Sequence, residues 1–125
     1  MRNLLAFDLG ASNGRAILGQ FDGEKITMRE LHRFENNYIE MNGVFYWDLP
    51  YLYNQLKQGL LAFKNANVGT LECIGIDTWG VDYGLLDKNG QLLSNPRSYR
   101  YALDADMEAC LLYTSPSPRD GLLSR

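Results

Sequence analysis

The sequence predicts an α/β fold in which a mixed β-sheet packs against a helix, with the element order strand, strand, strand, helix, strand. Residues 4–7 form a short apolar run, which is typical of a central strand covered on both faces. Asp22 and Gly23 join two extended segments, as in a β-hairpin. A segment with helical periodicity after Asp48 then precedes another apolar run within residues 71–78. We therefore expect the helix to return this later strand parallel to the first.

The extended stretches 15–21 and 25–34 should pair antiparallel. Asp-Gly is a strong hairpin signal because both turn positions favour positive φ. Together with residues 4–7, these stretches supply the first three strands.

Two further hairpins are indicated by Asn-Gly pairs. Residues 36–47 predict a small ribbon with its turn at 42–43. Residues 81–87 should pair with 91–93 around a second Asn-Gly turn at 89–90. The second of these hairpins should close the unit.

A helix is expected to begin after Asp48, whose side chain can cap it, and Pro50 falls in the first turn, where its missing N–H is harmless. Asn67 and Gly69 should end it. The apolar residues at helical spacing are Leu49, Leu52, Tyr53, Leu56, Leu60 and Phe63.

The strand after the helix, residues 71–78, is expected to be buried through Cys73, Ile74 and Ile76. Cys73 and Cys110 lie in no metal-ligand or disulfide pattern, so we expect buried or incidental thiols. His32, the single histidine, has no predicted nucleophile beside it and is typical of a surface or packed residue.

Composition favours a globular domain that acts on small molecules. The chain has 125 residues, 46% of them hydrophobic, and a net charge of -3 with scattered Lys and Arg. These features argue against nucleic-acid or anionic-membrane binding. No apolar run approaches the ~18 residues that span a bilayer, and no signal peptide is recognisable. A cytoplasmic location is therefore expected.

The domain organisation predicted is one partial domain at 1–109 followed by a non-native or disordered tail at 110–125. The tail reads CLLYTSPSPRDGLLSR, in which Ser-Pro-Ser-Pro breaks any periodicity. Part of it, CLLYTSPSPRD, resembles a translated sequencing adapter, and it is excluded from the fold reasoning.

The first candidate site follows the first strand. Backbone N–H groups at a tight turn can bind phosphate, and glycine permits unusual backbone angles. Arg15 adds a permanent charge suited to phosphate, and Asp8 suits a ligand of the accompanying Mg²⁺. The turn residues are Gly10, Ala11, Ser12, Asn13 and Gly14. The alternative is an ordinary hairpin connection with Asp8 capping backbone amides and Arg15 solvated.

A second polar group follows the strand after the helix. Asp77, Trp79 and Asp82 gather there, and ligands of open α/β sheets bind beyond the carboxyl ends of parallel strands. Trp79 could stack on a sugar while the carboxylates accept hydroxyl hydrogen bonds. We therefore expect both groups to share one crevice. The alternative is a core tryptophan with two aspartates in turns.

Four segments together resemble the N-terminal part of the rhamnulokinase group of FGGY-family sugar kinases. They are DLGASNGR at 8–15, RELHRFEN at 29–36, NGVFYWD at 42–48 and IGIDTWGVDYGLLD at 74–87. The resemblance covers residues 1 to about 100 and implies an actin-like ATPase, or ribonuclease H-like, fold. IDTWGVD is the more specific motif, since the DLG motif with its following arginine is shared by the wider actin-like superfamily.

The resemblance implies transfer of the γ-phosphoryl of ATP, with Mg²⁺, to the 1-hydroxyl of L-rhamnulose in rhamnose breakdown. It places phosphates at Ala11, Ser12, Asn13, Gly14 and Arg15, sugar at Gly80 with Trp79 and Asp82 nearby, and the metal at Asp8. After residues 98–100 the sequence departs from the family pattern. The family's general-base aspartate lies downstream, so these residues alone should not turn over substrate.

Two other functions remain open. The chain could be part of another FGGY kinase, acting on a xylulose- or fuculose-type sugar. It could instead be a non-catalytic actin-like module that binds nucleotide or sugar.

Overall fold

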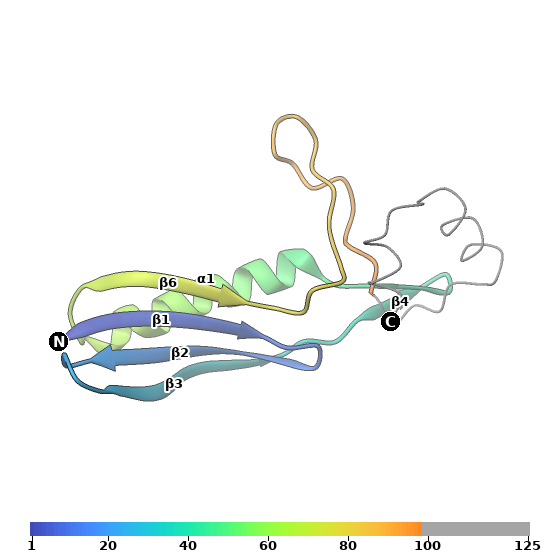
Figure 1. Ribbon diagram of the computed structural model, residues 1–125. Coiled ribbons are helices and arrows are strands. Elements are labelled where there is room, and N and C mark those ends of the chain that lie inside the picture. Colours follow the sequence, from blue (N-terminus) through green and yellow to red (C-terminus); the bar gives the residue numbers. More distant parts are fainter. Residues whose placement is uncertain (99–125) are drawn as a thin grey trace, which may run out of the picture.

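The computed structural model describes residues 1–98 and contains the predicted order of elements (Figure 1). No helix in this part of the chain has the length and apolar character needed to cross a membrane. The elements are β1 (Arg2–Leu9), β2 (Asn13–Phe21), β3 (Ile26–Glu35), β4 (Ile39–Met41), β5 (Val44–Tyr46), α1 (Leu49–Ala66) and β6 (Leu71–Asp77).

The main sheet has the strand order β3-β2-β1-β6 (Figure 1). β1, β2 and β3 are antiparallel neighbours, whereas β6 returns parallel to β1 after the α1 crossover. This mixed sheet confirms the predicted α/β class. β4 and β5 form a separate ribbon, as the Asn-Gly turn predicted.

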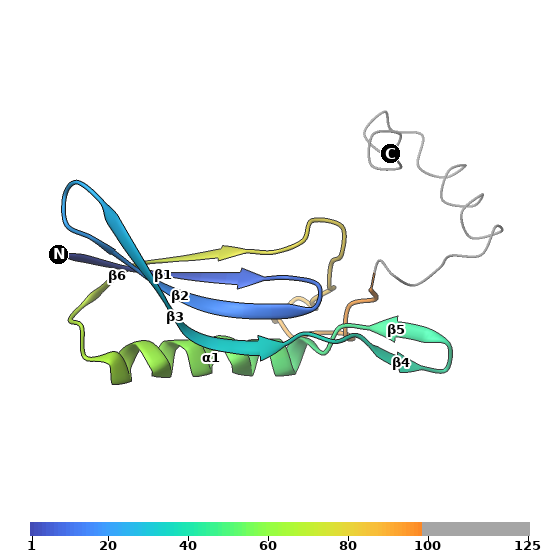
Figure 2. The same cartoon turned by 90° about the horizontal axis from the view of Figure 1, so that it is seen from below.

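The core lies between one face of the sheet and α1. Alternate residues of β1 and β2 point to that face, because successive side chains of a strand face opposite ways. Figure 2 shows α1 lying along the sheet. The buried cluster comprises Leu5, Phe7, Ala16, Leu18 and Phe63.

The two turn predictions fared differently. Asn42 and Gly43 both have positive φ, 54° and 76°, as expected of a two-residue turn. In the β2–β3 connection only Gly23 does, with φ of 104°, so the prediction of two positive angles there is wrong. The connection has four residues, and the Asp22 carboxylate stabilises it by accepting hydrogen bonds from later backbone N–H groups.

Both predicted ends of α1 are confirmed. The carboxylate of Asp48 accepts a hydrogen bond from the N–H of Tyr51 at 3.2 Å, and Pro50 lies in the first turn. Asn67 ends the helix in the left-handed conformation with φ of 52°, and its N–H donates to the carbonyl of Lys64.

The prediction that β6 is buried is wrong. Ile74 and Ile76 are 48% and 60% exposed, and Cys73 is exposed as well. β6 forms an edge of the sheet, and α1 packs mainly against the other three strands. An apolar run predicts a strand whose side chains favour burial, but whether they are buried depends on the elements that pack against them.

The predicted hairpin after β6 is present in a short form, in which Leu86 and Leu92 form an antiparallel bridge. The N–H of Asp87 donates to the carbonyl of Gln91 at 2.8 Å, and the N–H of Leu93 donates to that of Leu85 at 2.9 Å. The turn of this hairpin includes Gly90, with φ of 80°. The chain then runs beside β5, where the N–H of Ser98 donates to the carbonyl of Phe45 at 2.8 Å. The tail predicted at 110–125 lies outside the described residues.

Gly59 tests the close packing of α1 on the sheet. A Cβ atom there would lie 2.5 Å from the Phe7 ring and 3.0 Å from the Ala16 Cβ. We expect Gly59→Ala to lower the free energy of unfolding by about 1–3 kcal/mol, because overpacking outweighs the helix propensity of alanine. Chemical denaturation measures this. Gly75→Ala is the control, since its Cβ meets no atom within 4 Å; equal effects of the two changes would contradict the packing.

Candidate functional site

Asp8 and Arg15 face each other at the end of the β1–β2 hairpin. They are paired residues in the strand register, and the guanidinium Nη2 of Arg15 lies 2.6 Å from Oδ2 of Asp8. The side-chain hydrogen bond and the charge of Asp8 raise the pKa of Arg15. Arg15 is thus ion-paired in this structure. Both side chains remain about two-fifths exposed and accessible from solvent.

The turn between β1 and β2 is fixed by Asn36, a residue that the sequence analysis missed. Its N–H donates to the carbonyl of Ser12 at 3.0 Å, and its side-chain amide donates to the carbonyl of Gly10 at 2.7 Å. Asn36 is only 2% exposed. Asn36 follows the last residue of β3, Glu35, which pairs with Asn13 at the start of β2. An asparagine at this position lies beside the β1–β2 turn and can donate to its carbonyls.

The glycines of this turn serve packing rather than backbone freedom. Neither Gly10 nor Gly14 has positive φ, so the expectation of unusual angles there is wrong. A Cβ at Gly10 would lie 2.9 Å from the carbonyl oxygen of Asn13, and one at Gly14 would clash with the Phe34 ring. A larger residue at either place would require these neighbours to shift.

The proposed phosphate-binding residues divide between the turn and β2. Ala11 and Ser12 lie in the turn, whereas Asn13, Gly14 and Arg15 already belong to β2. Ser12 and Asn13 are exposed, while Gly14 is buried.

Trp79 and Asp82 form a cluster with Trp47, which follows β5 and which the sequence analysis did not single out as a site residue. Oδ2 of Asp82 accepts hydrogen bonds from both indole N–H groups, at 2.5 Å from Trp47 and 2.6 Å from Trp79. The two rings are 4.5 Å apart between centroids. We call these three residues the Trp-Asp-Trp clamp.

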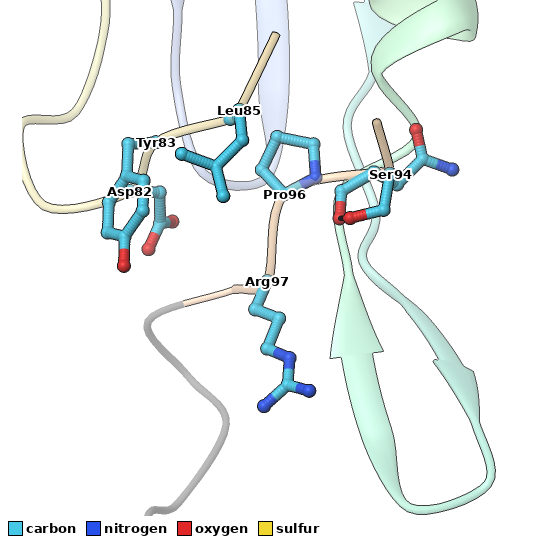
Figure 3. Close-up of a pocket in the computed structure, with 8 residues that line it drawn as sticks. Asp82, Tyr83, Leu85, Ser94, Pro96 and Arg97 are labelled. Carbon is cyan, nitrogen blue, oxygen red and sulfur yellow. Dashed lines mark hydrogen bonds between the residues drawn. The ribbon is translucent and has the colours of Figure 1, made fainter. Parts of the chain in front are cut away.

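Two pockets adjoin the clamp. One, of about 280 Å³, is mainly apolar. Its lining includes Leu9, Leu52, Leu56, Trp47 and Trp79. The other, of about 210 Å³, lies between residues 82–85 and 94–97 (Figure 3). Asp82 lines both.

The tips of β1 and β6 meet, but they do not form one crevice among the described residues. Asp8 and Asp77 are paired in the parallel register. Phe7 packs towards α1, so Asp8 points to the opposite face, whereas Leu9 lines the apolar pocket on the α1 side. The expected single crevice is therefore wrong: Asp8 and the Trp79 pocket flank the strand ends on opposite faces.

Carboxylate oxygens at this edge suit magnesium chemically, because Mg²⁺ prefers hard oxygen ligands and keeps several waters. Asp8 and its register partner Asp77 supply such oxygens on neighbouring strands. Residues 1–98 hold no group of three or more metal-ligating side chains. A cation here would thus need water or phosphate ligands, as in a metal–nucleotide complex.

Comparison with known proteins identifies close relatives. No protein-family model matches the chain. It is 48% identical over 100 residues to a rhamnulokinase of Mannheimia succiniciproducens, which covers 78% of this chain and 20% of that protein. A rhamnulokinase of Bacteroides thetaiotaomicron is 46% identical over 101 residues, 79% of this chain and 20% of the relative. The chain resembles the rhamnulokinases.

Solved structures confirm the expected architecture. A ligand-bound xylulose kinase of Lactobacillus acidophilus matches with a TM-score of 0.72 and 11% identity, over 91% of this chain and 23% of that one. A xylulose kinase of Rhodospirillum rubrum also matches with a TM-score of 0.72, at 16% identity, over 90% of this chain and 24% of its own. The fold is that of the FGGY sugar kinases, which is actin-like. The chain spans about a fifth of the length of the rhamnulokinases it matches.

Asn36 should be necessary for the turn. We expect Asn36→Ala to lower the free energy of unfolding by about 1–3 kcal/mol, because it leaves the half-buried carbonyl of Gly10 without its side-chain donor. Thermal or urea unfolding would measure the change. The neighbouring Asn37→Ala is the control; it removes only an exposed hydrogen bond to Glu35 and should stay within about 0.5 kcal/mol of the unaltered chain. If both variants are equally stable, Asn36 does not hold the turn.

Proposed function

We propose that this chain is part of an ATP-dependent kinase that phosphorylates the 1-hydroxyl of L-rhamnulose in rhamnose catabolism. The observation that carries the proposal is the similarity to rhamnulokinases, five of which are 41–48% identical to about four-fifths of this chain. The sugar-kinase fold supports the reaction class. We propose a cytoplasmic location, where ATP is available.

On the nucleotide side, Ala11, Ser12, Asn13, Gly14 and Arg15 would bind the ATP phosphates. Asn36 keeps the turn in one conformation before any ligand arrives, so little ordering is needed on binding. Arg15 offers a planar fork of N–H donors that can exchange the Asp8 carboxylate for a phosphate. Asp8 would then be available to the Mg²⁺, which neutralises charge on the phosphates.

On the sugar side, Gly80, Trp79 and Asp82 would bind the substrate. Gly80 does not have positive φ, and a Cβ there would meet no atom within 4 Å. The described residues thus give no packing reason for glycine at this position. We propose that the sugar approaches the backbone closely at this position, which a residue without a side chain allows.

The described residues position substrates rather than carry the full chemistry. Phosphoryl transfer needs a group that accepts the proton of the attacking hydroxyl, and we propose an aspartate beyond this sequence for that role. Without the residues that supply this aspartate, the attacking hydroxyl and the leaving group cannot be aligned. The 125-residue chain by itself should therefore be inactive.

Substrate choice in the full-length enzyme that carries these residues tests the proposal. A coupled assay of ADP release should give kcat/KM for L-rhamnulose about 100-fold or more above that for D-xylulose, L-fuculose and glycerol, because a site built for particular hydroxyls rejects sugars that leave its polar groups unpaired. Equal values for all four compounds would overturn the substrate assignment. Absence of ATP consumption would favour a non-catalytic module.

The role of Asp8 is tested separately in the same enzyme. We expect Asp8→Asn to lower kcat on the order of 100-fold and to raise the Mg²⁺ concentration needed for half-maximal rate, because a neutral amide is a weaker metal ligand. Asp22→Asn, in the exposed β2–β3 turn, is the matched control and should leave both unchanged. Unaltered kinetics in Asp8→Asn would show that Asp8 is not a ligand of the metal.

A further inference from the structure

The Trp-Asp-Trp clamp joins a segment without regular structure to a rigid part of the fold. Residues 78–82 follow β6 and belong to no helix or strand. Within them, the indole of Trp79 and the carboxylate of Asp82 bind each other at 2.6 Å. Both contact Trp47, which directly precedes the N-cap of α1. The clamp therefore fixes where this segment lies.

Trp47 is well placed to act as the anchor. Its side chain is 1% exposed, and its backbone N–H donates to the carbonyl of Pro96 at 2.8 Å. A ring held this firmly has little freedom to move with its partners. Trp47 also lines the apolar pocket, beside the two residues that it holds.

Asp82 links the two rings through one oxygen. A carboxylate has two oxygens and several acceptor sites, so Oδ2 can accept both indole N–H groups at once. Loss of the carboxylate would leave the buried N–H of Trp47 without this acceptor and release Trp79 from its place. Trp79 and Asp82 both line the apolar pocket of about 280 Å³, so the clamp also sets the shape of that pocket.

We propose that Trp47 and Asp82 are positioning residues for the sugar, which hold the Trp79 ring and the adjacent Gly80 backbone in their binding arrangement. The inference rests on the proposed function, because it assigns the sugar to Trp79 and Gly80. It gives Asp82 a second role, through Trp79, beside the proposed contact of Asp82 with the sugar, and it adds Trp47 as a positioning residue.

The kinetic test uses Trp47→Phe in the full-length enzyme. Phenylalanine keeps an aromatic ring but loses the N–H, so we expect KM for the sugar to rise about fivefold to tenfold while KM for ATP changes less than twofold. Asp82→Ala should have a similar effect, and Asp82→Asn, which keeps an acceptor oxygen, a smaller one. The double change Trp47→Phe with Asp82→Ala should be no worse than Asp82→Ala, because both act through Trp79.

Phe63→Leu is the control for stability. It alters another buried aromatic residue of the core that lines neither pocket. It should lower the melting temperature without changing KM for the sugar. If Trp47→Phe leaves KM for the sugar unchanged, or raises KM for ATP equally, the positioning role is overturned.

A spectroscopic test separates the clamp from the kinase assignment. This test uses the 125-residue chain, which has two tryptophans, so that Trp47→Phe leaves Trp79 as the sole tryptophan emitter. Adding Asp82→Ala in that background should shift the emission of Trp79 to longer wavelength and increase its quenching by acrylamide. Unchanged emission and quenching would show that Asp82 does not hold Trp79. If the wild-type enzyme phosphorylates no sugar but the emission shifts, the proposed function fails while the clamp stands.

Discussion

The parallel pairing of β1 with β6 is the constraint on which the rest of the structure depends. It brings residues nearly seventy positions apart into register, so that Asp8 lies opposite Asp77. α1 makes this pairing possible because a parallel neighbour requires a crossover connection. As a result, the β1–β2 turn, which Asn36 holds, and the segment with Trp79 both follow the carboxyl ends of these two strands. The β1–β2 turn and the segment with Trp79 lie near each other only because β1 and β6 are paired.

The second determinant is uneven coverage of the sheet. α1 buries the inner face of β1 and β2, whereas β6 keeps one open edge and exposed isoleucines. The apolar pocket forms where the start of α1, Leu9 and the clamp come together, so it lies on the covered side. Asp8 lies on the other face. The chain spans about a fifth of the length of its rhamnulokinase relatives.

Features encoded by local chemistry could be predicted from the sequence. The Asn-Gly turn at 42–43, the Asp48 cap and the left-handed Asn67 depend on residues within a few positions of one another. Asn36 and Trp47 could not be found in this way, because their partners lie more than twenty residues away. The single-crevice hypothesis failed because the strand pleat sends Asp8 and Leu9 to opposite faces. The sugar-kinase proposal is accordingly carried by the relatives and the fold rather than by a single shared pocket.

Cross-strand nuclear Overhauser effects between β1 and β6 test the central pairing most directly. In the 125-residue chain, we expect contacts between backbone protons of Ala6 and Gly75 and of Asp8 and Asp77, together with slow amide exchange in β1. These contacts would establish the shared edge in solution. Their absence, or a register displaced by two residues, would separate Asp8 from Asp77 and contradict the arrangement from which both binding groups were inferred.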